Sequence, residues 1–502
     1  MSAGNGNSGA ARPWPRWAQA VLLLLPVALS WSLTRRQPAL LIDDAYITFR
    51  YAENLVRGHG LVFNPGERVL GTTAPLWAGI LAGAGAMGFL IPAAALFLGR
   101  LFTALTCGLV SLILWRRVAA APAIIAGLVL AVHPDVIFFA NSGMETGFYM
   151  ALVLASLGAG LEEWFMVSAL LGAAGFLTRP DGALLLILGA VLALAKGGKP
   201  LVRFAAAATV MVLPWLIFAT LYYGSPIPLS IAAKRLDHPT DLIALMRGYA
   251  VHLLPAPPMY VLALLAIPGG VLVLLRRLKL WPFAAWVALY AAGLILTRIA
   301  PVFPWYVTPL FPMLMILAAW SSQILFFSES PAWLRSRRRL AAWSGVVVLA
   351  GLGLWLFSWR DYYFQIRRMQ FARAQDYLEI GQWVATQAQP GDKVLVGEVG
   401  AVGYALMDFE VLDSSGIAAP EIYRLRLDHH ERQLQAGQQP DSAQWVKAVI
   451  ARFRPYWIVT WYKFLFLHDL SRDSQIVAHY RRVFPPLPGK DQFFVLQRQE
   501  AR

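Results

Sequence analysis

The chain has 502 residues, of which 58% are hydrophobic and only 14% are charged, against about 25% charged in an ordinary soluble domain. This composition excludes a soluble globular protein, because no soluble fold could cover so much apolar surface, and it predicts a polytopic α-helical membrane protein. The formal net charge of +15 does not indicate nucleic-acid binding, because the cations cluster in short loops between apolar runs.

Apolar runs of roughly 20 residues, the length that crosses a bilayer, recur along the first 359 residues. If the basic clusters at 116–117, 196–199, 276–279 and 335–339 face the cytoplasm, the short apolar segment 76–91 cannot cross, and we expect it to form a juxtamembrane or re-entrant helix. About eleven transmembrane helices remain, at 17–34, 96–115, 120–140, 147–161, 164–178, 182–196, 201–222, 256–275, 282–298, 306–327 and 341–358. We therefore expect a disordered cytoplasmic N-terminus (1–16), a transmembrane domain (17–359) and a first extracytoplasmic loop at 35–95.

The loops that this topology places outside the cytoplasm are the ones with unusual polar residues. They lie at 43–44, 141–146, 178–182, 223–252 and 298–306. Charged groups at a membrane boundary lose hydration, and they are more often functional than decorative. The sequence therefore predicts a site on the outer face.

From residue 360 onward the composition becomes that of a soluble domain. Strand-like runs at 393–397, 409–413, 456–461 and 493–497 alternate with helix-like runs at 372–387 and 442–452. This pattern predicts a small α/β domain at 360–502. Because the eleventh span runs outward, we expect this domain outside the cytoplasm.

Two adjacent carboxylates, Asp43 and Asp44, directly follow the first span and begin a helix-like run. Neighbouring residues on a helix point about 100° apart, so the two cannot face one atom as a tight dyad. One could act as a base while the other caps the helix start, where an acid interacts well with the helix dipole. Capping alone is the commoner role of such a pair, but its place at the bilayer edge favours catalysis.

The run DDAYITFRYAENLVRGHGLVFNPGERV at 43–69, with TTAPLW at 72–77, closely resembles the first extracytoplasmic loop of membrane glycosyltransferases of the GT-C type. The nearest resemblance is to the mycobacterial terminal arabinofuranosyltransferases, and a more distant one is to the aminoarabinose transferases that modify lipid A. Shorter stretches continue it: NSGMET at 141–146, TRPDG at 178–182, YGSPIPLSIAAK at 223–234 and FPWYVTPLFP at 303–312. One departure is LGTT at 70–73, where the family pattern leads us to expect an acid or an aromatic residue before the threonines.

The resemblance implies an inverting transfer of a sugar, such as arabinofuranose or another pentose, from a polyprenyl-phosphate donor to an envelope glycan or lipid acceptor. By analogy, Asp43 or Asp44 is the base that removes the proton of the acceptor hydroxyl. The leaving phosphate needs cations, for which Arg179, Lys234 and Arg298 on the predicted outer face are candidates.

Four more residues are candidates for contacts with the donor phosphate or the substrate: Arg50, His59, Glu145 and Tyr306. Glu145 matches the position of a second acid in these transferases. It could orient the acceptor or share a divalent cation with Asp43 and Asp44, although no cofactor is required by the pattern. Its structural alternative is to cap the following helix.

The other candidates also have structural alternatives. Arg179 could form an ion pair with Asp181 that closes a helix hairpin, and Lys234 could lie on a solvated loop face. Arg298, at the end of a span, could extend to the interface. His59, which lies between two glycines, could be a turn residue.

A transporter or flippase of lipid-linked glycans is the main alternative to a transferase. The one-sided placement of polar residues, the absence of acids in mid-span and the lack of an inverted repeat argue against it. A non-catalytic envelope scaffold that binds through the α/β domain is a third hypothesis. We expect a multi-pass protein of the bacterial inner membrane with a periplasmic C-terminal domain, whose partners are the lipid donor, the acceptor and membrane lipids.

Overall fold

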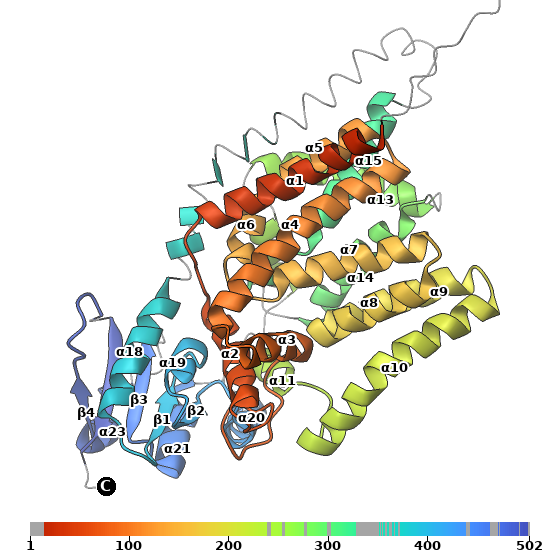
Figure 1. Cartoon of the computed structure of the whole chain (residues 1–502). Coiled ribbons are helices and arrows are strands. Elements are labelled where there is room, and N and C mark those ends of the chain that lie inside the picture. Colours follow the sequence, from red (N-terminus) through yellow and green to blue (C-terminus); the bar gives the residue numbers. More distant parts are fainter. Residues whose placement is uncertain are drawn as a thin grey trace, which may run out of the picture.

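The computed structural model describes residues 15–237, 242–253, 257–275, 279–298, 303–327, parts of 351–369, 372–437, 442–461, 470, 472–490 and 492–499. Figure 1 shows two parts, a large set of helices and, at the C-terminal end, a sheet with its own helices. The segment that follows the first helix, residues 37–74, lies between them.

The helical part follows the apolar runs of the sequence. Its elements are α1 (Arg16–Arg36), α2 (Asp43–Val56), α3 (Pro75–Ala86), α4 (Ile91–Arg117), α5 (Ala120–Ala131), α6 (Pro134–Ala140), α7 (Thr146–Leu161), α8 (Phe165–Thr178), η1 (Pro180–Gly182), α9 (Ala183–Leu194), α10 (Gly198–Tyr223), α11 (Leu229–Asp237), α12 (Leu242–Leu253), α13 (Pro257–Leu275), α14 (Trp281–Thr297), η2 (Pro304–Tyr306) and α15 (Leu310–Phe327).

Within the described residues, α1, α4 and α10 are long and apolar enough to cross a membrane, and the bent pair α5 and α6 would make a fourth span. The remaining apolar helices provide shorter stretches, of 10–17 residues each. The run 120–140, predicted as one span, is two helices that meet at an angle of 60°. Pro134 begins α6, and a residue before proline disfavours the helical conformation, so the break falls at His133. The predicted span 341–358 lies largely outside the described residues, and the count of eleven stays a prediction.

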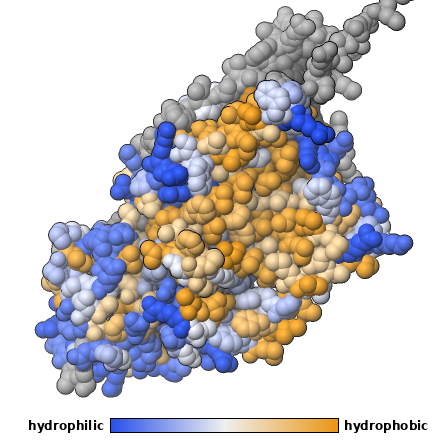
Figure 2. Space-filling model, viewed as in Figure 1, coloured by the Kyte–Doolittle hydropathy of each residue, from blue (hydrophilic) through white to orange (hydrophobic). Residues whose placement is uncertain are grey.

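Apolar side chains cover the outside of the helices. Figure 2 shows a broad hydrophobic face over the helical part, while hydrophilic residues gather over the C-terminal part at the lower left. On α10, Val210 is 73% exposed and Leu221 is 80% exposed. Apolar surface of this extent on exposed helices fits contact with lipid.

The C-terminal part is built on a five-stranded sheet with strand order β2-β1-β3-β5-β4. Strands β2, β1 and β3 are parallel, and β5 and β4 add to them in antiparallel fashion. The elements are α18 (Arg373–Gln387), β1 (Lys393–Val396), α19 (Gly400–Ala405), β2 (Glu410–Asp413), α20 (Pro420–Gln435), α21 (Ser442–Phe453), β3 (Trp457–Trp461), α23 (Ser474–His479), β4 (Tyr480–Val483) and β5 (Phe493–Arg498).

Helices cover both faces of this sheet, as the side chains of β1 illustrate. Val394 and Val396 belong to the cluster that includes Tyr377 of α18 and Val402 of α19. Leu395 points the other way, as alternation along a strand requires, and belongs to the cluster formed with α20 and α21. The first of these clusters also contains residues of α2 and of the long helices, so the two parts of the chain share one core.

The loop at 57–74 and the C-terminal residues 400–418 are joined by buried hydrogen bonds. The guanidinium of Arg50 donates to the backbone carbonyls of Phe63, Gly403, Leu406 and Phe409, and also to the side chain of Asn64. These bonds hold α2 and its following loop against α19.

Candidate functional site

A cavity of about 380 Å³ lies where α2, the loop at 71–74, α11 and α14 meet. The loops that precede α7 and α9 and the η2 turn complete its wall, and Ile417 contributes from the C-terminal part. It gathers, from segments far apart in the sequence, five residues that were predicted for the site: Asp44, Glu145, Arg179, Lys234 and Tyr306.

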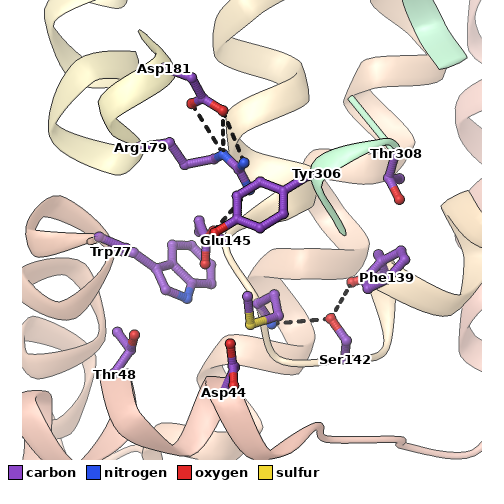
Figure 3. Close-up of polar contacts among 12 residues, drawn as sticks. Asp44, Thr48, Trp77, Phe139, Ser142, Glu145, Arg179, Asp181, Tyr306 and Thr308 are labelled. Carbon is purple, nitrogen blue, oxygen red and sulfur yellow. Dashed lines mark hydrogen bonds and ion pairs between the residues drawn. The ribbon is translucent and has the colours of Figure 1, made fainter. Parts of the chain in front are cut away.

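Asp44 lies in the first turn of α2 and lines the cavity. Its Oδ2 is 3.1 Å from Nζ of Lys234, and both side chains are about one-quarter exposed. Thr48 lies one helical turn further on and also lines the cavity. In Figure 3 both residues project from the same helix on one side of the site, opposite Arg179 and Glu145.

Asp43 has different partners, although it is the adjacent residue. Its Oδ2 accepts a hydrogen bond from the backbone N–H of Gly400 (3.0 Å), and its Oδ1 accepts one from the N–H of Ala401 (2.7 Å). Asp43 therefore binds the start of α19 in the C-terminal part and does not line the cavity. The predicted division between a site-facing and a capping carboxylate exists, but the capped helix is α19.

A second buried acid lies near Asp43. Glu398 pairs with Arg373 at 3.1 Å, and Arg373 stacks over the Trp461 ring at 4.0 Å. Burial raises the pKa of Glu398 to about 8, assisted by the charge of Asp43 and opposed by Arg373. Burial likewise raises the pKa of Asp43 to about 6, and the bonds from the two backbone amides oppose this rise.

Arg179 is buried between two acids and two aromatic rings. Its Nη2 lies 2.9 Å from Oδ2 of Asp181, and its Nη1 lies 3.5 Å from Oε1 of Glu145. The guanidinium carbon is 5.1 Å from the ring centroids of both Tyr149 and Tyr306. Figure 3 shows Glu145 and Tyr306 close beside Arg179, with Asp181 on its far side. The ion pair with Asp181 that the sequence offered as an alternative is thus present, and it holds Arg179 at the cavity.

Two local features of the chain position Glu145, Arg179 and Asp181 beside one another. Glu145 is the N-cap residue of α7, but its side chain makes no capping hydrogen bond, and it turns to Arg179 instead. Gly182 allows η1 to pack tightly on α8, because a Cβ there would overlap the backbone of Gly175. Burial raises the pKa of Glu145, and the positive charge of Arg179 opposes this rise.

Lys234 and Arg235 reach the cavity from α11, which follows the loop at 224–228. The backbone N–H of Leu229 donates to the carbonyl of Leu70, so α11 is fixed to the loop after α2. Nζ of Lys234 lies 4.8 Å from the centroid of the Phe303 ring. Arg235 is exposed and lines the cavity, and the described part of the chain provides it with no acidic partner.

Part of the cavity lining is apolar. It is formed by Leu289, Gly293 and Leu294 of α14 and by Leu184 of α9. Trp305, of which only 4% is exposed, lies near the cations. The cavity lining therefore combines charged and apolar residues.

Besides Asp43, three predicted residues lie away from the cavity. Arg50 is fully buried, and backbone carbonyls and Asn64 occupy its guanidinium, so it secures the loop and is not positioned to bind a ligand. His59 is exposed in the turn between Gly58 and Gly60, as its alternative role anticipated. Arg298 ends α14 in a left-handed conformation with its side chain exposed.

No group of three or more His, Cys, Asp or Glu residues suited to a metal ion is present among the described residues. The three acids named as ligands of a divalent cation do not form one. Amides of α19 bind Asp43, Lys234 pairs with Asp44, and Arg179 pairs with Glu145.

Sequence reasoning did not single out several cavity residues. Thr48 could have been found from its spacing of four residues after Asp44, which places both on one helix face. Arg235 could have been found from its place directly after the candidate Lys234. Ile417 carried no signal, because it comes from the C-terminal part and reaches the cavity only through the fold.

Comparison with known proteins relates this chain to membrane glycosyltransferases. The chain is 30% identical over 284 residues to the terminal β-(1→2)-arabinofuranosyltransferase of Mycobacterium tuberculosis, in a match that covers 50% of this chain and 43% of that protein. The matched segment thus spans less than half of the relative's length. A family model described as a domain of unknown function (DUF8728) matches residues 364–497.

Solved structures with a similar fold include ArnT from Cupriavidus metallidurans bound to undecaprenyl phosphate, with a TM-score of 0.57, 12% identity and coverage of 96% of this chain and 97% of that one. The apo form of ArnT gives a TM-score of 0.58 at 14% identity, with coverage of 96% and 98%. The Archaeoglobus fulgidus oligosaccharyltransferase, tethered with an acceptor peptide, gives a TM-score of 0.53 at 11% identity. The match covers 97% of this chain and 74% of that one. The predicted resemblance to GT-C membrane glycosyltransferases is confirmed, and the chain has their fold.

Proposed function

We propose that this chain is an inverting glycosyltransferase of the bacterial inner membrane. It moves a sugar, arabinofuranose or another pentose, from a polyprenyl-phosphate donor to an envelope glycan or glycolipid acceptor on the extracytoplasmic side. The observation that carries the proposal is one cavity that combines a carboxylate, cations and an apolar wall. A lipid phosphate that carries a sugar needs all three.

Asp44 is the base in this proposal. The acceptor oxygen attacks the anomeric carbon as the bond from that carbon to the phosphate oxygen breaks, and the bonding electrons leave with the phosphate. Asp44 takes the proton of the acceptor hydroxyl. Its carboxylate is paired with Lys234, and the arriving phosphate competes for that cation, which frees Asp44 to accept the proton.

Lys234 and Arg235 stabilise the charge that develops on the departing phosphate. Arg179, which is already neutralised by two acids, positions Glu145 and Tyr306 for contact with the sugar or the acceptor. The apolar residues of α14 and α9 receive the first units of the prenyl chain.

The relatives support the transferase over the alternative of a flippase. ArnT is similar over nearly its whole length and binds undecaprenyl phosphate, and the aligned mycobacterial protein is named as an arabinofuranosyltransferase.

The decisive experiment is Asp44→Asn in proteoliposomes supplied with a polyprenyl-phosphate arabinofuranose and a glycan acceptor. We expect transfer to fall by about 10²–10⁴-fold with donor binding retained, because general-base catalysis contributes a factor of this size. Glu53→Gln is the matched control, since Glu53 is on the same helix but pairs with Arg57 away from the cavity. Full activity of Asp44→Asn would refute the assignment, and movement of intact donor without product would favour the flippase.

A further inference from the structure

A second hollow, of about 400 Å³, lies on the side of the helical part at the ends of α1 and α4 that adjoin α2. Trp31 and Arg35 line it from α1, and Phe97 and Arg100 line it from α4 with Ala93 and Leu96. It shares no residue with the cavity described above. The proposed transfer reaction therefore does not account for it.

Two arginines meet in this hollow without an acid. Nε of Arg100 donates to Oδ1 of the buried Asn141 at 2.8 Å, which fixes the guanidinium and leaves its two terminal nitrogens without a hydrogen-bond partner in the described chain. Arg35 is exposed, its guanidinium carbon lies 5.7 Å from the centroid of the Trp31 ring, and it has no acidic partner among the described residues. Two cations that converge at one hollow repel each other unless an anion lies between them.

The remaining lining of the hollow is apolar and aromatic. The rings of Trp31 and Phe97 meet edge to face at a centroid distance of 5.8 Å, and 53% of Phe97 is exposed. Both belong to helices that are long and apolar enough to cross a membrane. Isolated arginine and tryptophan residues are common at helix ends near a membrane surface. Here, however, they converge on one hollow, and a buried asparagine holds one of the arginines.

We propose that this hollow binds the headgroup of an anionic phospholipid. The phosphate oxygens accept hydrogen bonds from Arg35 and Arg100, which suit a phosphate through the fork geometry of the guanidinium. The acyl chains lie over Phe97 and the exposed apolar side chains of the two helices. A membrane phospholipid is favoured over the prenyl-phosphate donor because the hollow and the reaction cavity have no lining residue in common.

The test is native mass spectrometry of the detergent-purified full chain titrated with phosphatidylglycerol. We expect the wild type to retain this lipid in preference to zwitterionic phosphatidylcholine. Arg35→Gln with Arg100→Gln should weaken retention by about tenfold or more, because hydrogen bonds to charged groups contribute at least this factor. Arg35→Gln alone removes an exposed side chain, so it tests the site even if the double variant folds poorly, and it should cause a several-fold loss.

Arg36→Gln is the matched control, since it removes the same charge from an exposed neighbour that does not line the hollow. Its retention of phosphatidylglycerol should stay within about twofold of the wild type. An equal loss in Arg36→Gln, or equal binding of phosphatidylcholine by the wild type, would overturn the site. So would displacement of the lipid by an equal concentration of glycerol phosphate or of undecaprenyl phosphate.

Discussion

Asp43 and Asp44 are adjacent, yet the fold gives them separate partners. Asp44 meets Lys234 at the cavity, whereas Asp43 accepts two amide hydrogen bonds from α19. Helix geometry alone predicted that the two acids could not act on one atom. It could not decide which one faces the site, because that depends on the docking of α19, more than 350 residues away.

The cations of α11 give a prediction on donor affinity. Lys234→Met and Arg235→Gln should each raise the KM for the prenyl-phosphate donor, by about tenfold, because each removes a positive charge that faces the phosphate. Lys234→Met should also lower kcat, since Lys234 contacts the proposed base. Steady-state kinetics in proteoliposomes measure both quantities. Arg203→Gln, on an exposed part of α10 outside the cavity, is the control. An unchanged KM in both variants would contradict the phosphate role of α11.

Glu398 gives a prediction on stability against pH. Its pKa is about 8 in the folded protein against 4.5 for an ordinary glutamate, so between these values the folded state binds more protons than the unfolded state. The free energy of unfolding therefore falls as pH rises from about 4.5 to 8. The raised pKa of Asp43 acts in the same direction between 3.8 and about 6.

Glu398→Gln should remove most of this dependence and raise the apparent melting temperature at pH 8. Each kcal/mol added to the free energy of unfolding raises the melting temperature by about 2–4 °C or less in a chain of this size. Thermal unfolding in detergent at pH 5, 6.5 and 8 would measure it. Glu410→Gln is the comparison, because Glu410 forms a half-exposed pair with Lys393. A rise in the stability of the wild type between pH 5 and 8 would contradict this prediction, because it would mean that Glu398 and Asp43 do not control how stability changes with pH.

At the level of elements, apolar patterning predicted most of the C-terminal strands to within one or two residues. The four predicted runs correspond to β1, β2, β3 and β5, whose buried residues are mostly apolar. Strand β4 was missed because Arg481 and Arg482 are exposed on it and hide the apolar pattern. The segment 76–91 forms α3 and the start of α4, and its exclusion from the spans stays a prediction.

The contact between α19 and the start of α2 gives a prediction of its own. A Cβ on Gly400 would lie 2.6 Å from the carbonyl carbon of Asp43, well inside van der Waals contact. Gly400→Ala should therefore separate the two helices, destabilise the protein by about 1–3 kcal/mol and displace Asp44. We expect transfer to fall by about 10²-fold, since a shift of about 1 Å can have this effect.

The control for Gly400→Ala is Gly79→Ala in α3. A Cβ on Gly79 would meet nothing within 4 Å, and alanine favours a helix, so stability and transfer should be unchanged or slightly higher. Both variants need the same two measurements, the apparent melting temperature and the rate of transfer. Wild-type transfer in Gly400→Ala would mean that α19 does not position the proposed base.

On the scale of the whole molecule, the sequence predicted two domains but not the shared core and hydrogen bonds that join the two parts. The cluster that contains Phe49 and Phe63 of the first loop continues into Val402 and Leu406 beside the sheet. Hydrogen bonds between residues more than 340 positions apart join the same regions. Local periodicity carries no information on such pairs, because it reports only which face of an element is buried.

This union predicts that the C-terminal part stays docked during turnover. Arg57 and Asp408 form an exposed ion pair of 2.9 Å across the contact, so cysteines at both positions should react with a short, cleavable bismaleimide. The native Cys107 is buried and should not react. We expect the cross-linked protein to transfer sugar within about twofold of the uncross-linked form, because the cross-link only fixes a contact that already positions Asp43. Loss of transfer that returns when the linker is cleaved would show instead that the C-terminal part must move away from the first loop in each catalytic cycle.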